Sequence, residues 1–261
     1  MVEKKYTKYR FIKKLYEDSS RINKRGEFLK KNSNRISSIR DILIELSLND
    51  MKKNVIDYGC GSGSFIQKFD KIHNNTACYA VDIVRNKAIA ENKNINYQVI
   101  YPSQFPKYNV CFDIIFCMNV LYHLDSKLLE DLFQWFKLIL KSNGVIYITT
   151  KSSNNFPEFN KMVTKINNIE YPISDESSFC SENCFDIVRK SFYENIFSIE
   201  QYDIKTQIIT KDFEAVYKYM LSNNRYSDIF LIKDEIMNNL KKSTLFIDQY
   251  HETILKIKII K

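Results

Sequence analysis

Residues 54–65 read Asn-Val-Ile-Asp-Tyr-Gly-Cys-Gly-Ser-Gly-Ser-Phe, and this stretch decides the fold. A short apolar run ends at Asp57 and is followed by Gly59, Gly61 and Gly63, three of the five glycines in the chain. Glycines between a strand and a helix let a ligand approach the backbone beside the amino terminus of the helix. The stretch therefore predicts a strand, a ligand-binding loop and a helix.

Strands and helices alternate after this loop at short, regular spacing. Apolar and β-branched runs predict strands, and apolar residues three or four positions apart predict the helices between them. Such alternation is typical of right-handed βαβ units in a parallel sheet. The expected strands are 54–57, 77–82, 96–101, 112–118, 145–150, 197–204 and 253–260, and the expected helices are 62–71, 85–92, 125–140, 181–193, 211–221 and 228–241, with a turn at 141–144.

Two further segments complete the expected organisation. Residues 1–48 are polar, with apolar residues at helical spacing near their end, and predict two or three helices that form an amino-terminal cap. Residues 49–261 form the main domain, in which the alternating pattern loosens after Thr150. We expect residues from about 151 to 195 to be an insertion that closes over the site as a lid.

Size, charge and cysteine content restrict the class of protein. A chain of 261 residues suits one large domain with an inserted segment. The net charge of +8 can indicate an anionic partner such as nucleic acid, but the lysines are spread along the whole chain and also fit a bias in composition. The six cysteines form no CxxC pair, so we expect no metal site and a reduced, cytoplasmic protein without a membrane span.

The spacing of the glycine loop separates two classes of nucleotide-binding fold. Dinucleotide-binding proteins carry Gly-x-Gly-x-x-Gly, whereas this chain has Gly-x-Gly-x-Gly. Asp57 precedes the first glycine by two residues, and its carboxylate would repel a pyrophosphate but suits a cationic ligand. The methionine end of S-adenosylmethionine (SAM) is cationic, so the sequence favours SAM over NAD as the cofactor.

With these residues, segment 55–65 resembles motif I of the class I SAM-dependent methyltransferases. The resemblance covers residues 35–150 and implies an α/β fold with a doubly wound, seven-stranded, mostly parallel sheet. It implies that Asp82, which ends the second expected strand, holds both ribose hydroxyls, with Ile83 beside it. It also implies that the acid and the glycines of the loop surround the cofactor: Asp57, Gly59, Gly61 and Gly63.

The resemblance assigns the methionine end of the cofactor to two further segments. Arg35 lies about one helix ahead of motif I, where related methyltransferases place an arginine on the SAM carboxylate, and Arg40 is its rival for that role. The fourth expected strand resembles motif IV of the family. Asn119 and Val120 follow this strand and are expected to line the methionine end of SAM.

One position departs from the family pattern. The family often has an aspartate after the third strand that binds the adenine amino group, and this chain has Tyr101 there. We expect Ser103 or Gln104, or backbone groups, to hold the adenine instead.

The residues that contact the methyl acceptor are expected in two places. Tyr122 and His123 follow motif IV and should face the substrate cavity, although His123 could equally hold the loop through a structural hydrogen bond. The lid carries acids beside a tyrosine that could accept a proton, although most lid acids are merely solvated. The catalytic candidates are Tyr122, His123, Tyr171 and Asp175, with Glu170 and Glu176 as further lid acids.

Three functions compete at this point. We predict methyl transfer to a small molecule, natural product or peptide, preferably at an amine nitrogen, since the length and architecture resemble plantazolicin-type peptide N-methyltransferases. The alternative is an rRNA or tRNA base methyltransferase, because residues 119–122 resemble Asn-Leu-Pro-Tyr of adenine N6 enzymes, without the proline. A non-catalytic SAM-binding protein is the third possibility, and the oligomeric state stays open.

Overall fold

The computed structural model describes most of the chain between the two terminal segments. The described residues are 13, 20–168, 179–192, 197–223, 226 and 229–259.

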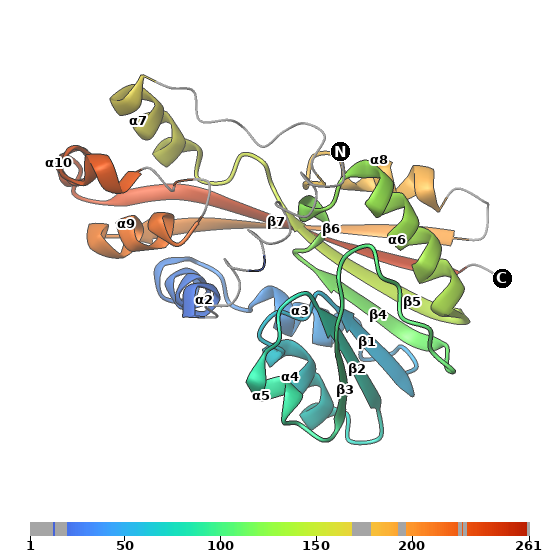
Figure 1. Ribbon diagram of the computed structural model, residues 1–261. Helices are drawn as coiled ribbons and strands as arrows, with labels where there is room; N and C mark the ends of the chain where they lie inside the picture. The colour runs from blue at the N-terminus through green and yellow to red at the C-terminus, as the bar shows by residue number, and fades with distance from the viewer. Residues whose placement is uncertain are drawn as a thin grey trace.

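A seven-stranded sheet forms the centre of the molecule, with strand order β3-β2-β1-β4-β5-β7-β6 (Figure 1). The pairs among the first five strands in this order are parallel, whereas β7 runs antiparallel to both of its neighbours. The predicted doubly wound, seven-stranded, mostly parallel sheet is therefore confirmed. The strands are β1 (Asn54–Tyr58), β2 (Ala77–Asp82), β3 (Ile95–Val99), β4 (Phe112–Met118), β5 (Leu140–Lys151), β6 (Phe197–Thr210) and β7 (Phe246–Ile259).

Helices cover both faces of the parallel part of the sheet. On one face, α3 (Ile39–Leu46), α4 (Ser64–Ile72) and α5 (Lys87–Ala90) bury apolar side chains against β1, β2 and β4. On the other face, α6 (Ser126–Ile139) and α8 (Cys184–Ser191) bury a second cluster that includes the whole apolar stripe of α6. Both faces of the central strands are thus removed from water, which explains why β4 is almost wholly apolar.

A third apolar cluster lies beyond the parallel strands, where β6 and β7 extend as a long antiparallel pair. Helices from distant parts of the sequence gather at this end, as Figure 1 shows. Phe28 and Tyr219 show how they pack, with ring centroids 4.6 Å apart. We call this group the cap; its helices are α2 (Ser20–Asn32), α7 (Pro157–Asn167), α9 (Phe213–Leu221) and α10 (Lys233–Lys241), with the short η3 (Ile229–Ile232) before α10.

The structure corrects three local predictions. Residues 141–144 belong to a strand rather than a turn, because β5 begins at Leu140. The Lys141 ammonium donates to both carboxylate oxygens of Asp113, each at 2.9 Å. The segment after β5 contains a helix, α7, that the sequence analysis did not predict. Strands β6 and β7 are each longer than predicted because they pair with each other over 14 residues.

None of the described helices combines the length and apolar character needed to cross a membrane.

Candidate active site

A cavity of about 750 Å³ lies between the carboxyl ends of the parallel strands and the cap. At this edge of the sheet β1 and β4 are neighbours, and the strand order continues from them in opposite directions, through β2 and β3 on one side and β5 on the other. Open α/β sheets bind ligands at such a point. The loop after β1 forms one end of the cavity, and residues of α2, α9 and β7 form the other. The cavity therefore joins the predicted cofactor loop to the cap.

The glycine loop can take its shape only without side chains. Gly59 has a φ of 73°, in the left-handed region, and a Cβ at this position would lie 2.1 Å from Cγ2 of Val120. Gly63 has a φ of 70°, and a Cβ there would lie 2.6 Å from Cδ1 of Ile89. Gly61 differs, because a Cβ would meet no protein atom within 4 Å and the residue lines the cavity. The loop is thus packed from behind and open toward the cavity.

Asp82 ends β2 and holds the glycine loop. One carboxylate oxygen accepts a hydrogen bond from the Gly61 amide at 2.7 Å, and the other accepts from the Val84 amide at 2.9 Å. Burial raises the pKa of Asp82 even though these hydrogen bonds act in the opposite direction. Each carboxylate oxygen can accept more than one hydrogen bond, so both retain capacity for the two hydroxyls of a ribose.

Asp57 lies two residues before the loop, with no exposed surface, and the described residues offer neither of its carboxylate oxygens a hydrogen bond. Burial raises its pKa to about 7, an effect that the positive charge of Arg40 reduces and the charge of Asp82 reinforces. Asp57 is not part of the cavity wall, so it could act on a ligand in the cavity only through its charge. A buried carboxyl without a partner fits a cationic ligand nearby.

Asn119 follows β4 in a left-handed conformation, with a φ of 56°, and its amide donates to the Thr149 carbonyl at 2.9 Å. Its side-chain oxygen is buried and accepts no hydrogen bond from the described residues. Asn119, Val120, Tyr122 and His123 all line the cavity, the last two from the short helix η1 (Leu121–His123). The predicted segment after motif IV is therefore brought to the cavity as a unit.

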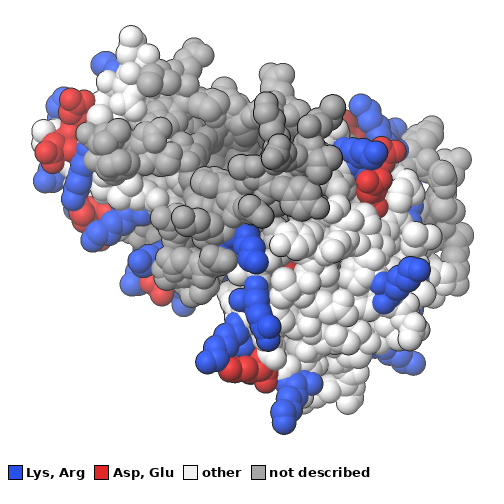
Figure 2. Space-filling view, viewed as in Figure 1, with Lys and Arg blue, Asp and Glu red and all other residues white. Residues whose placement is uncertain are grey.

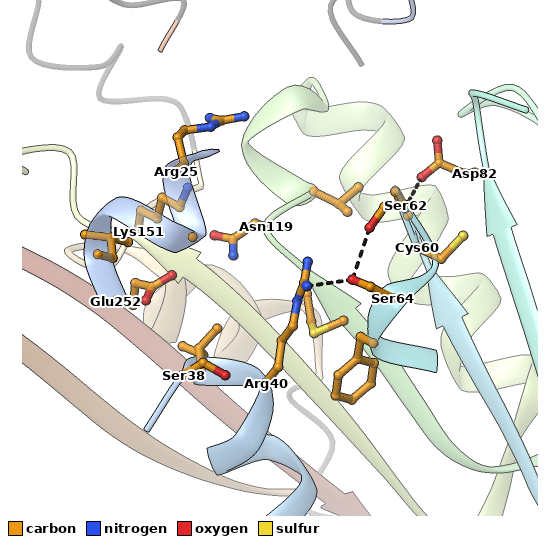
Figure 3. Close-up of a pocket in the computed structure, with 18 of the residues that line it drawn as sticks. Arg25, Ser38, Arg40, Cys60, Ser62, Ser64, Asp82, Asn119, Lys151 and Glu252 are labelled. Atoms are coloured by element: carbon orange, nitrogen blue, oxygen red, sulfur yellow. Dashed lines mark hydrogen bonds between the residues drawn. The ribbon is translucent and has the colours of Figure 1, made fainter. Parts of the chain in front are cut away.

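The two rival arginines both line the cavity but contact different elements. Arg40 donates to the Ser64 hydroxyl at 2.6 Å, beside the glycine loop (Figure 3). Arg35 lies 2.6 Å from Glu252 of β7 in a nearly buried ion pair, and it also donates to the Ser37 carbonyl. Arg40 is thus the arginine beside the loop, whereas Arg35 connects the segment between α2 and α3 to β7.

Other predicted residues lie away from the described cavity or outside the described part of the chain. Ser103 and Gln104 are exposed and do not line the cavity, whose wall there consists of Ile83, Ile100 and Pro102. The geometry gives the predicted adenine contact of Ser103 no support. The predicted lid residues lie outside the described residues: Glu170, Tyr171, Asp175 and Glu176.

The sequence analysis missed the polar residues at the cap end of the cavity. They come from α2, the end of β5, α9 and β7, so no local pattern joins them. Lys151 had a usable signal, because it ends a strand beside β4 and must reach the same edge of the sheet. The missed lining residues are Arg25, Glu27, Lys30, Lys151, Tyr219, Tyr250 and Glu252.

The residues present fit SAM. Asp82 offers acceptors for a diol, Asp57 offers a buried carboxyl whose charged form a nearby cation would stabilise, and Asn119 offers an unused buried acceptor. Gly61 leaves open space where a side chain would otherwise project. Among the described residues, no group of three His, Cys, Asp or Glu side chains could hold a metal ion.

This combination of fold and site defines the class of SAM-binding methyltransferases. Comparison with family models agrees: the model described as "Methyltransferase domain" matches residues 31–203. The chain therefore belongs to the methyltransferase domain family, and SAM, the predicted cofactor, is the one that this family uses.

Individual relatives have different acceptors in their names. The tRNA U34 carboxymethyltransferase of Campylobacter jejuni is 28% identical over 165 residues, which cover 57% of this chain and 55% of the relative. The phosphoethanolamine N-methyltransferase of Plasmodium falciparum is 24% identical over 206 residues, which cover 73% and 70%. The chain thus spans about half the length of the curated relatives that it matches first.

A solved structure of the plantazolicin methyltransferase BpumL with S-adenosylhomocysteine (SAH) has a similar fold. The TM-score is 0.54, with 11% sequence identity and coverage of 97% of this chain and 96% of the other. At this identity the likeness shows the fold alone.

Proposed function

We propose that the protein transfers a methyl group from SAM to an amine nitrogen of a small molecule, a natural product or a peptide. The cavity carries this proposal, because it continues from the cofactor loop to the cap and is walled there by α2, α9 and β7. A volume of about 750 Å³ is within the usual range for sites that enclose a small ligand. An acceptor in the cap half would be held against the cofactor and away from water.

Each half of the cavity has residues suited to one task. Asp82 would bind the ribose hydroxyls and Arg40 the carboxylate of the methionine moiety, with Asp57 supplying a compensating charge for its ammonium group. SAM supplies an activated methyl group. The protein then contributes mainly the alignment of the acceptor, which is what in-line displacement requires.

The acceptor nitrogen must have a free lone pair when it reacts. Its lone pair forms the new N–C bond, the S–C bond breaks, and the bonding electrons stay on sulfur. Tyr122 and His123 line the cavity next to Asn119, with ring centroids 4.3 Å apart, and are our candidates for orienting the nitrogen or receiving its proton. Tyr171 and Asp175 of the predicted lid remain further candidates for receiving this proton.

An RNA acceptor is the second candidate function, and the tRNA U34 carboxymethyltransferases among the relatives favour it. The surface offers less support. On the face shown in Figure 2, acidic side chains lie among the Lys and Arg side chains, so the described residues there do not form one broad basic surface. The name of the phosphoethanolamine enzyme supports a small-molecule acceptor. A cytoplasmic location would suit both candidates.

The deciding experiment is methyl transfer from labelled SAM to two separate pools, total RNA and a set of small amines and short peptides. We expect label in the second pool, and we expect the Asp82→Ala variant to lose it. Label in RNA alone would overturn the proposal. Binding of SAH, measured by calorimetry in the same preparation, shows that the enzyme under test has an intact cofactor site.

A further inference from the structure

The cap end of the cavity concentrates positive charge. Arg25 from α2 and Lys151 from the end of β5 both line it, as does Arg35. Figure 3 shows Arg25, Lys151 and Glu252 together on the side of the cavity away from Asp82, with Asn119 next to them. The cofactor end and this cationic end are therefore different parts of one cavity.

Two acids among the described lining residues belong to this end, Glu27 and Glu252, and Glu27 lies exposed on α2. Glu252 binds Arg35 at 2.6 Å, and both side chains are nearly buried. Neither Arg25 nor Lys151 forms an ion pair with a carboxylate in the described part of the chain. Arg35 also has a second guanidinium nitrogen that is buried and without a hydrogen-bond partner there. With Lys30 included, the described cap end thus has four cations for the two carboxylates of Glu27 and Glu252.

Arg25 and Lys151 lie close enough to affect each other. Burial, together with the charge of Arg25, lowers the pKa of Lys151 to about 8, although the charge of Glu252 acts in the opposite direction. Two like charges in a partly enclosed site are unfavourable unless a third group compensates them. A ligand with negative charge is the natural compensation, since no carboxylate of the described residues forms an ion pair with either cation.

The position of Lys151 indicates which ligand would supply this negative charge. β4 and β5 are adjacent and parallel, with Met118 beside Thr149, so Asn119 and Lys151 leave the sheet at the same edge. Asn119 belongs to the part of the cavity proposed for the methionine end of SAM. Lys151 and Arg25 therefore lie beyond the transferred methyl group, where the acceptor must bind.

We infer that the methyl acceptor is a small molecule with an anionic group, a carboxylate or a phosphate monoester, which Arg25 and Lys151 bind. Arg35 and the tyrosines of the cap wall, Tyr219 and Tyr250, offer further hydrogen-bond donors around the same space. Anchoring the anionic end would direct the other end of the acceptor toward Asn119. This inference rests on the proposed function, because it names the chemistry of the acceptor in that site.

The test measures anion binding and needs no turnover. Inorganic phosphate and acetate are titrated separately into the full-length protein saturated with SAH, at constant ionic strength with chloride, and heat is recorded by calorimetry. We expect saturable binding of at least one anion to one site. Stronger binding of phosphate would indicate a phosphate monoester as the acceptor group, and stronger binding of acetate would indicate a carboxylate.

Matched variants separate a built site from general attraction. Arg25→Gln should weaken anion binding about tenfold or more, as loss of a charge-assisted hydrogen bond does. Lys24→Gln removes the same charge from the neighbouring, exposed position of α2 that does not line the cavity, and it should leave binding unchanged. Lys151→Gln should behave like Arg25→Gln, and Lys151→Arg should retain binding.

Two results would overturn the inference: no saturable binding of either anion to the SAH complex, or equal loss of binding in Lys24→Gln and Arg25→Gln. These outcomes are distinct from failure of the proposed function. If label from SAM enters RNA alone while phosphate still binds the SAH complex in an Arg25-dependent way, the small-molecule function fails and the anion site stands. If SAH binds but neither anion does, the inferred anionic group of the acceptor is wrong, while methyl transfer to an amine without such a group still stands.

Discussion

Replacement of Gly59 by alanine puts a methyl group where the side chain of Val120 already lies. The added Cβ would be 2.1 Å from Cγ2 of Val120, far inside the van der Waals distance, and the backbone there has a φ of 73°. A left-handed conformation costs a residue with a side chain about 1–2 kcal/mol. Overpacking a well-packed site costs about 1–3 kcal/mol more. We therefore expect Gly59→Ala to destabilise the protein by about 2–5 kcal/mol.

Gly61→Ala is the matched control two residues away. Its φ of 55° is also left-handed, but the added Cβ meets no protein atom within 4 Å. Only the conformational cost of about 1–2 kcal/mol remains. Because Gly61 lines the cavity, the new methyl group should instead obstruct SAH and weaken its binding about tenfold or more.

Urea unfolding without ligand, followed by the fluorescence of Trp135, measures the stability difference. Trp135 is the one tryptophan of the sequence and its ring lies 5.8 Å from that of Tyr58, next to the loop. Calorimetry with SAH measures affinity. Equal losses of stability in the two variants, or SAH affinity of Gly61→Ala equal to that of the wild type, would refute this account of the loop.

Three further predictions concern the charged residues around the cofactor loop. Asp82→Asn should weaken SAH binding about 10–100-fold by calorimetry, because a charged acceptor for the ribose hydroxyls is lost; unchanged affinity would contradict the assigned role. Arg40→Met should weaken SAH binding, whereas Arg35→Met should mainly lower stability, by about 3 kcal/mol in urea, since it leaves Glu252 buried without its partner. The reverse pattern would favour Arg35 as the carboxylate ligand. Because burial raises the pKa of Asp57 from 3.8 to about 7, its contribution to stability is complete below pH 4 and is lost as the pH rises through 7. Asp57→Asn, which does not titrate, should therefore be more stable than the wild type at pH 8 but not at pH 4, by urea unfolding; a difference independent of pH would show that Asp57 does not titrate in this range.

The cofactor half of the site could be predicted from the sequence because its residues follow single strands. Asp57 and the glycines lie in one short stretch, and Asp82 and Asn119 each come directly after a recognisable strand. Parallel strands bring their carboxyl ends to one edge, so a local pattern predicts a shared location. The same reasoning reaches Lys151 once β5 is extended to its true end.

The cap could not be predicted in this way. Its helices pack through one cluster in which Phe28, Phe159, Val216 and Ile236 come from four separate segments. Helix α7 did have local signals, since Pro157 occupies its first turn and Asn168 follows it in a left-handed conformation. Its polar and aromatic composition concealed them. The added length of β6 and β7 depends on their mutual pairing, which no single segment reveals.

The two halves of the cavity therefore differ in how they can change. The cofactor half depends on a few strand ends whose backbone conformation admits little substitution, as Gly59 and Gly63 show. The half that we propose for the acceptor is built from side chains on α2, α9 and β7, elements held together by apolar packing that does not depend on Arg25 or Tyr219 keeping its polar group. Exchange of these polar groups would alter the charge that the acceptor meets while the cofactor half stays the same. Relatives that share this domain have different acceptors in their names, so under the proposed function the charge of the cap wall is a better guide to the acceptor than the fold.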